Sequence, residues 1–171
     1  MTGSPVAAPA TRDGTPEVRL LDATQLGLDD AGLRSFARAA TRRTGAPHSS
    51  RSYRYPYALI TWHDAPVGVD LERIEACDEA FADLICTPAE RADPACSADR
   101  DNYLSSLWCA KEALAKALGD ARRYDPARLE SPARWPGRRA GPWRTAPLAV
   151  TPGHVGWICW RALDRHPGVI G

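Results

Sequence analysis

The chain has 171 residues, 44% of them hydrophobic and 25% charged, with a formal net charge of +1. This length fits one domain or a small protein of two lobes, and the composition excludes a wholly disordered chain, a collagen and a coiled coil. No window approaches the ~18 apolar residues of a membrane-spanning helix. The five cysteines are odd in number and form no C-x-x-C pair. This disfavours a disulfide framework and a zinc site, and it favours a reducing cytoplasm as the location.

The charges fall into three blocks, with a net charge of +3 over residues 1–63, −8 over 64–101 and +6 over 102–171. A nucleic-acid-binding protein needs one continuous basic face, so this pattern disfavours that class. An acidic centre between basic flanks suits a protein that holds a cation in the middle and anions at the edges, although chance scatter is the alternative. Of the 22 basic residues only two are lysines, and both lie in residues 107–116. This placement indicates a specific role for the two ammonium groups, again with chance as the alternative.

The first half of the chain alternates between helix and strand signals. Residues 1–16 lack the apolar core of a secretory signal and are expected to form a disordered leader. An apolar stripe predicts a helix over residues 29–43, and β-branched and aromatic residues predict strands over 57–62 and 67–74. We expect these two strands to form a hairpin through the turn at 63–66.

The second half begins with a short helix over residues 78–86, followed by Thr87 and Glu90 in a capping box. The longest helix is predicted over residues 98–118, ending at Gly119. Residues 120–145, rich in Pro, Gly and Arg, are expected to be exposed and irregular, and a terminal hairpin follows over 145–151 and 154–162. Without βαβ regularity or a glycine-rich phosphate loop, this order predicts an α+β fold.

The strand over residues 67–72 alternates between two kinds of side chain. One face is apolar, and the other carries Gly68, Asp70 and Glu72. Two carboxylates at i and i+2 repel each other unless water or a cation lies between them, and their hard oxygens suit Mg²⁺. The simpler alternative is a solvated acidic face.

The long helix places Lys111 inside an apolar stripe formed by Leu104, Leu107, Leu114, Ala115 and Leu118. An ammonium group there must extend to solvent or meet a buried anion. Trp108, Glu112 and Lys116 line the next face at steps of four. The simpler alternatives are an ordinary Glu112–Lys116 ion pair and a Trp108 that only fills the core.

Together these two motifs resemble the paired signature of the 4′-phosphopantetheinyl transferases. The first is Gly68-Val-Asp70-Leu-Glu72, and the second, about forty residues further on, is Trp108-Cys-Ala-Lys111-Glu112-Ala-Leu-Ala-Lys116. Residues 81–91 are similar to the linker of that family. The resemblance covers about residues 50–165 and is closest to the larger, surfactin-synthetase-activating type. It implies a pseudo-dimer of two small α/β lobes, with a reduced first lobe over 17–66 and a second lobe over 67–165.

The resemblance implies an Mg²⁺-dependent enzyme that moves the phosphopantetheine arm of coenzyme A to a serine of an apo acyl or peptidyl carrier protein. Adenosine 3′,5′-bisphosphate would be released, and the carrier would serve polyketide or nonribosomal peptide biosynthesis. Asp70, Glu72 and Glu112 would hold Mg²⁺, and Glu112 would also be the base. Lys111 and Lys116 would neutralise phosphate oxygens, and Lys116 would thereby assist catalysis.

The chain departs from the family where a Ser-His pair usually contacts the coenzyme A phosphates. Here the pair is Ser52-Tyr53, and tyrosine carries no positive charge near pH 7. Arg51 is therefore expected to share the phosphate contact, and Arg43 to replace a lysine that the shortened first half lacks. A non-catalytic module that binds carrier proteins or coenzyme A is the alternative function. Neither nucleic acid nor a membrane is an expected partner.

Overall fold

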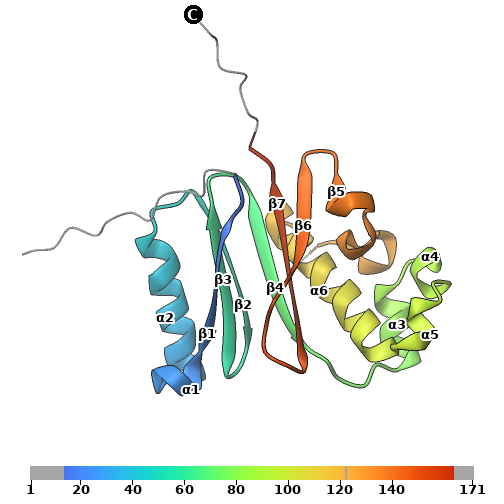
Figure 1. The fold of residues 1–171 in the computed structure, drawn as a ribbon, viewed down its shortest axis with the longest axis horizontal. Coiled ribbons are helices and arrows are strands. Elements are labelled where there is room, and N and C mark those ends of the chain that lie inside the picture. The colour runs from blue at the N-terminus through green and yellow to red at the C-terminus, as the bar shows by residue number, and fades with distance from the viewer. Residues whose placement is uncertain (1–13, 122, 164–171) are drawn as a thin grey trace, which may run out of the picture.

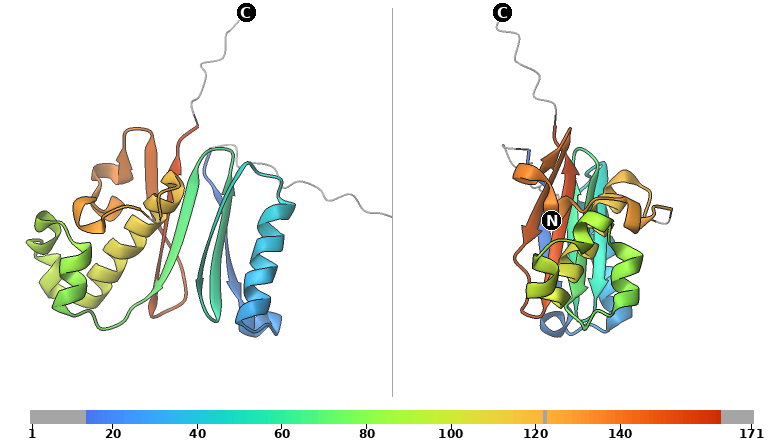
Figure 2. Two further views of the ribbon diagram at one scale, coloured as in Figure 1. Left: turned by 180° about the vertical axis from the view of Figure 1, so that it is seen from behind. Right: turned by 90° about the vertical axis from the view of Figure 1, so that its right-hand side faces the viewer.

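Two antiparallel sheets fill the middle of the molecule, with helix α2 (Asp30–Arg43) against one and helix α6 (Arg100–Leu118) against the other (Figures 1 and 2). The computed structural model describes residues 14–121 and 123–163. The layers therefore run helix, sheet, sheet, helix, and an apolar core that includes Leu59, Val69 and Ile158 lies between the sheets. Most of the predicted leader lies outside the described residues, and its last residue, Pro16, is buried.

The first sheet has the order β1-β3-β2, and its strands are β1 (Glu17–Asp22), β2 (His48–Arg54) and β3 (Tyr57–His63). A short helix, α1 (Ala23–Leu26), joins β1 to α2. The strand predicted over residues 57–62 corresponds to β3, and the helix predicted over 29–43 corresponds to α2. The apolar stripe of α2 packs Ala37 against Ile60 and Trp62 of β3. The sequence pattern missed β1 and β2, because the polar run of β2 has no apolar alternation.

The second sheet has the order β4-β7-β6-β5, and its strands are β4 (Val67–Arg73), β5 (Arg139–Ala140), β6 (Trp143–Leu148) and β7 (His154–Arg161). The predicted hairpin between β3 and β4 is wrong, since β3 pairs with β1 and β2 while β4 pairs with β7. The turn at 64–66 instead carries the chain from one sheet to the other. The predicted terminal hairpin is confirmed as β6 and β7.

Three short helices, α3 (Glu79–Ile85), α4 (Pro88–Arg91) and α5 (Ala95–Ala98), precede α6. The capping box of Thr87 and Glu90 is confirmed, and so is the left-handed Gly119 that ends α6. The predicted stripe of α6 is buried except for Leu118, which is 48% exposed. Leu118 was placed wrongly because it lies in the last turn of the helix.

The segment after α6 is only partly the exposed, irregular stretch that its composition predicts. It forms three single turns of 3-10 helix, η1 (Pro126–Arg128), η2 (Pro132–Arg134) and η3 (Pro136–Arg138). Ser131 is completely buried, and its hydroxyl donates to the Leu107 carbonyl. Such hydrogen bonds tie the segment to α6, and a composition rich in Pro and Arg does not reveal them.

Gly68 sets the distance between β4 and α6. A Cβ atom there would lie 2.0 Å from the Ala113 oxygen and 2.5 Å from the Ala117 nitrogen. The backbones can approach this closely only because residue 68 has no side chain. Asp70 and Glu72, on the same face of β4, are thereby brought against α6. In the part of the chain that the structure describes, no helix is long and apolar enough to cross a membrane.

Candidate active site

Asp70 lies at the centre of the seam between β4 and α6 and is 3% exposed. Its Oδ1 accepts hydrogen bonds from Lys116 Nζ at 2.6 Å and from Ser52 Oγ at 2.7 Å. Its Oδ2 is buried and has no partner within the described residues. A buried carboxylate oxygen without a donor is unusual, and it marks a place where a ligand can bind.

Glu72 accepts hydrogen bonds from two elements that lie far apart in the sequence, β2 and α6. Arg54 Nε donates to its Oε2 at 2.7 Å, and Trp108 Nε1 donates to its Oε1 at 3.1 Å. Burial, together with repulsion from Asp70, raises the pKa of Glu72 to about 7. The side chain of Trp108 therefore does more than fill the core, because it fixes one of the predicted site carboxylates.

Glu112 projects from the same side of α6 as Trp108 and Lys116. Its Oε1 accepts a hydrogen bond from the Tyr124 hydroxyl at 2.5 Å. Burial raises the pKa of Glu112, and it also raises that of Tyr124, whose hydroxyl therefore stays protonated. Lys116 forms its ion pair with Asp70, not with Glu112 one turn away.

Lys111 lies elsewhere. Its side chain is fully buried, and Nζ donates to Glu90 Oε2 at 2.7 Å, to the Ile85 oxygen at 2.5 Å and to the Pro126 oxygen at 2.8 Å. Of the two expectations for Lys111, access to solvent or a buried anion, the structure shows the second, and the anion is Glu90. Its three donor positions are filled, so the structure does not support the predicted contact of Lys111 with a phosphate.

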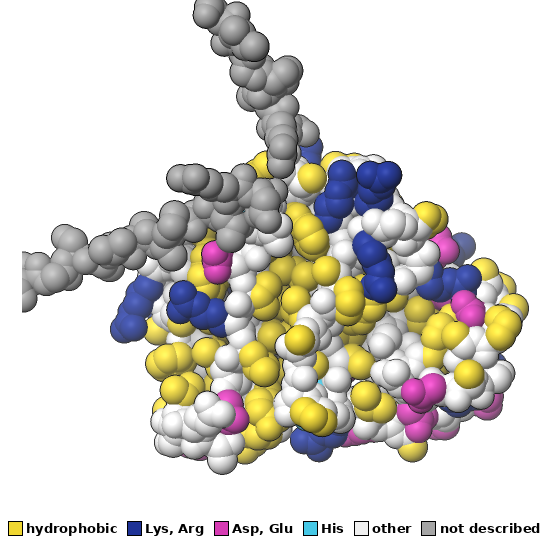
Figure 3. Space-filling model, in the orientation of Figure 1, with side chains coloured by type: hydrophobic (Ala, Val, Ile, Leu, Met, Phe, Trp, Pro, Cys, Tyr) yellow, Lys and Arg dark blue, Asp and Glu magenta, His cyan; other side chains and the backbone are white. Residues whose placement is uncertain are grey.

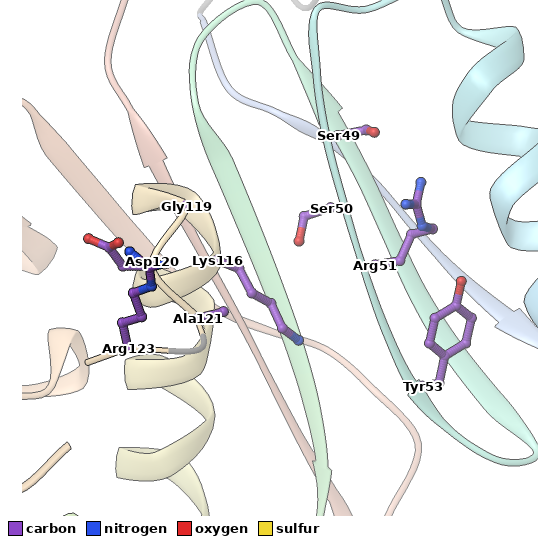
Figure 4. Close-up of a pocket in the computed structure, with 9 residues that line it drawn as sticks. All are labelled: Ser49, Ser50, Arg51, Tyr53, Lys116, Gly119, Asp120, Ala121 and Arg123. Atoms are coloured by element: carbon purple, nitrogen blue, oxygen red, sulfur yellow. The ribbon is translucent and has the colours of Figure 1, made fainter. Parts of the chain in front are cut away.

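A pocket of about 630 Å³ opens between β2 and the end of α6 (Figure 4). Lys116 extends across it towards the side of β2 that carries Ser50 (Figure 4). Arg51 lies on the opposite side of β2, where its Nη1 donates to Thr41 Oγ1 at 2.7 Å. The lining residues are Ser49, Ser50, Arg51, Tyr53, Lys116, Gly119, Asp120, Ala121 and Arg123.

Only some of the predicted phosphate-binding residues line this pocket. Arg51, Tyr53 and Lys116 line the pocket, whereas Ser52 faces Asp70 instead. The Tyr53 hydroxyl is buried without a partner in the described part of the chain. Arg43 lies exposed at the end of α2 and does not line the pocket.

Sequence reasoning missed several residues of this region. Ser49, Ser50 and the residues just beyond Gly119 line the pocket, although they belong to neither motif. Tyr124 was missed for the same reason, since nothing in a single sequence distinguishes it from its neighbours. The one available signal was position, because a segment that follows the end of α6 directly must lie near Lys116.

Asp70, Glu72 and Glu112 carry oxygen atoms of the chemical type that binds a divalent cation. Asp70 offers a buried oxygen without a donor, and repulsion from Asp70 contributes to the raised pKa values of both Glu72 and Glu112. A hard cation among these oxygens would relieve that repulsion. Across residues 14–121 and 123–163, however, no three His, Cys, Asp or Glu side chains are close enough together to form a metal site.

A family model described as the 4′-phosphopantetheinyl transferase superfamily matches residues 66–143. The segment is therefore similar to that superfamily. It contains β4 and α6, with all the acidic and lysine residues of the two motifs, so the resemblance seen in the sequence is confirmed.

A curated relative, 4′-phosphopantetheinyl transferase psf-1 of Bacillus pumilus, is 32% identical over 87 residues. The match covers 45% of this chain and 34% of the relative. The matched region therefore spans about a third of the relative's length. The mixed helices and antiparallel sheets are compatible with the α+β fold that the motifs predict.

Proposed function

We propose that this protein transfers the 4′-phosphopantetheine arm of coenzyme A to a serine hydroxyl of an apo acyl or peptidyl carrier protein. One observation carries the proposal: three carboxylates and Lys116 lie on the facing sides of β4 and α6, beside a pocket that β2 completes. When the two-residue strand β5 is left out, the second sheet has the order β4-β7-β6, which repeats the first-third-second order of β1-β3-β2. This repetition supports a pseudo-dimer of two lobes with the pocket between them.

Coenzyme A would bind through its phosphates. The pocket offers the cations of Lys116 and Arg123 and the hydroxyl of Ser50, whereas Arg51, which also lines it, donates to Thr41 on the other side of β2. Tyr53 also lines the pocket, but its hydroxyl is buried and it supplies no positive charge in place of a histidine. Because these contacts are charge-assisted, the affinity for coenzyme A should weaken as ionic strength rises.

A magnesium ion would be held by Asp70 and Glu112, with Glu72 adding negative charge from the next position on the same strand face. Both oxygens of Glu72 already accept hydrogen bonds, so Asp70 Oδ2 is the oxygen best prepared for a cation. When bound, Mg²⁺ would offset the negative charge of the diphosphate and orient it. Without it, three nearby carboxylates would repel an anionic substrate.

The reaction requires a base and charge neutralisation. Glu112 would take the proton of the incoming serine hydroxyl as the serine oxygen bonds to the phosphorus that carries pantetheine. The bond from that phosphorus to the bridging oxygen breaks, and adenosine 3′,5′-bisphosphate leaves with the electron pair. Lys116 would neutralise the phosphate oxygens, which matches what phosphoryl transfer demands of a protein. The free cysteines of the described chain favour a reducing, cytoplasmic setting.

The carrier would approach from the basic side of the second half of the chain. Figure 3 shows Lys and Arg side chains gathered over β5 and the start of β6, away from an acidic region near the short helices. Arg138 and Arg139, at this place, are exposed. An acidic carrier would be attracted to this surface, and the alternative is a solvated segment with no role in recognition.

The test is the mass of an apo carrier protein incubated with the chain, coenzyme A and Mg²⁺. A gain of one phosphopantetheine group, dependent on the chain, would support the transferase. Carrier binding without any mass gain would contradict it and favour the non-catalytic module. A matched reaction with Asp70→Ala controls for a contaminating transferase, because only transfer by this chain should disappear.

A further inference from the structure

The side chain that contacts Glu112 comes from outside both motifs. The Tyr124 hydroxyl donates to Glu112 Oε1 at 2.5 Å, from a half-buried position in the segment that follows α6. We propose that Tyr124 is a positioning residue for Glu112: its hydrogen bond fixes Oε1 and leaves Oε2 to accept the serine proton. This inference rests on the proposed function, because it assigns the orientation of the proposed base.

A positioning residue must itself be held, and the buried ion pair of Lys111 and Glu90 does this. Lys111 Nζ donates to the Pro126 oxygen, two residues beyond Tyr124, at 2.8 Å. Glu90 Oε1 accepts from the backbone nitrogen of Ser131 at 2.7 Å. The ion pair therefore fastens both ends of the stretch from 126 to 131 to the protein interior, and this stretch begins two residues after Tyr124.

The same helix links the two ends of this arrangement. Lys111 and Glu112 are adjacent on α6, so the lysine that anchors the segment and the glutamate that receives the hydrogen bond move together. This explains why a lysine with no access to the pocket stands in the motif beside Glu112. It also explains why a segment rich in Pro and Arg can hold a hydroxyl at hydrogen-bonding distance.

Tyrosine suits this task because its rigid ring carries a donor at the tip and loses little rotamer freedom when it is fixed. Tyr124→Phe removes only the hydroxyl and keeps the ring. Tyr103→Phe is the matched control, since Tyr103 is also half-buried and its hydroxyl donates to the Glu90 backbone oxygen, not to Glu112. Neither tyrosine lines the pocket.

The experiment measures kcat and KM for the chain, Tyr124→Phe, Tyr103→Phe, Glu112→Gln and the double variant of Tyr124 and Glu112. We expect Tyr124→Phe to lower kcat by roughly tenfold to a hundredfold, as misplacement of a reacting group does, with KM for coenzyme A unchanged. Tyr103→Phe should keep the kcat of the unaltered chain. The double variant should be no slower than Glu112→Gln alone, because Tyr124 acts only through Glu112.

A thermal unfolding scan of each variant identifies losses that come from misfolding. The inference is overturned if a folded Tyr124→Phe keeps its kcat, if it changes KM alone, or if the two substitutions multiply in the double variant. An unaltered chain that transfers nothing would instead overturn the proposed function, and this inference with it. The two failures are therefore distinguishable in one set of assays.

Discussion

The two sheets, each covered by a helix, serve two different purposes. We call β1–β3 with α1 and α2 the first lobe, and β4–β7 with α3–α6 the second lobe. In the first lobe, α2 meets its sheet through apolar side chains such as Leu33, Ala37 and Ile60. In the second lobe, part of the corresponding surface between β4 and α6 is taken by Asp70 and Lys116. Charge at this seam, not the arrangement of elements, separates a packing unit from a candidate active site.

The first lobe contributes to the site nevertheless, through one edge strand. Residues of β2 that face the second lobe form hydrogen bonds with β4 at every other position. Ser50 Oγ accepts from the Val69 backbone nitrogen, Ser52 Oγ donates to Asp70 and Arg54 Nε donates to Glu72. The site is thus built by the second lobe and completed by the first.

The largest effect should come from Asp70, the residue with the buried, unpaired oxygen. We expect Asp70→Ala to lower the transfer rate by at least about 100-fold, as loss of a group that stabilises developing charge does, while the fold persists. Glu75→Ala is the control, because Glu75 is an exposed acid just beyond β4. The measurement is carrier modification over time. Near-normal activity of Asp70→Ala would place the reaction elsewhere.

Loss of the buried Lys111–Glu90 ion pair in the second lobe should destabilise the protein more than loss of an exposed ion pair in the first lobe. Lys111→Met leaves Glu90 charged and unpaired, and it should lower the free energy of unfolding by about 3–5 kcal/mol. The first lobe offers a contrast in the exposed pair of Arg34 and Asp30, where Arg34→Ala should cost less than about 1 kcal/mol. Urea denaturation measures both. Equal costs would show that the second lobe does not depend on its buried pair.

Close packing at Gly68 should have the next largest effect. Gly68→Ala places a methyl group against the α6 backbone and should cost about 1–3 kcal/mol, typical of an overpacked core. It should also lower the transfer rate, since β4 must shift and carry Asp70 away from Lys116. Denaturation and rate assays on one preparation test this together. An unchanged rate would mean that the distance between β4 and α6 is not critical.

The raised pKa of Glu72 predicts how stability varies with pH in the absence of divalent cations. The folded chain binds this proton more tightly than the unfolded chain, whose carboxyl has an ordinary pKa near 4.5, because the folded value is about 7. The contribution is therefore fully present below pH 4.5 and is lost as pH rises towards and through 7. Glu72→Gln should show a smaller loss of unfolding free energy between pH 5 and 8. A loss of the same size would assign the pH dependence to other groups.

The sequence predicted the parts of this molecule whose signals are local. Periodicity located α6, the Thr87 capping box located α4, and the alternation of Asp70 and Glu72 identified the polar face of β4. It could not predict which strands pair, because pairing is decided by the burial of both faces of β4 between distant elements. The sequence also placed Lys111 at a phosphate, because its actual partner, Glu90, lies 21 residues away on a different helix.

The smallest expected effect concerns recognition of the carrier by the second lobe. Reversing two charges, Arg138→Glu with Arg139→Glu, should raise KM for the carrier severalfold and leave KM for coenzyme A unchanged, because rim charges act mainly on the association rate. Salt should raise the carrier KM of the unaltered chain and have less effect on the variant, whose attraction is already lost.

The matched control reverses the same amount of charge on the first lobe. Arg38 and Arg42 lie exposed on α2, away from β5, so Arg38→Glu with Arg42→Glu changes the net charge equally but not the surface near Arg138. If both double variants raise the carrier KM alike, net charge alone attracts the carrier. If neither does, the basic segment has no part in recognition. Only a rise confined to the second lobe supports a docking surface there, and it would extend the contrast between the lobes from the seam to the outer surface.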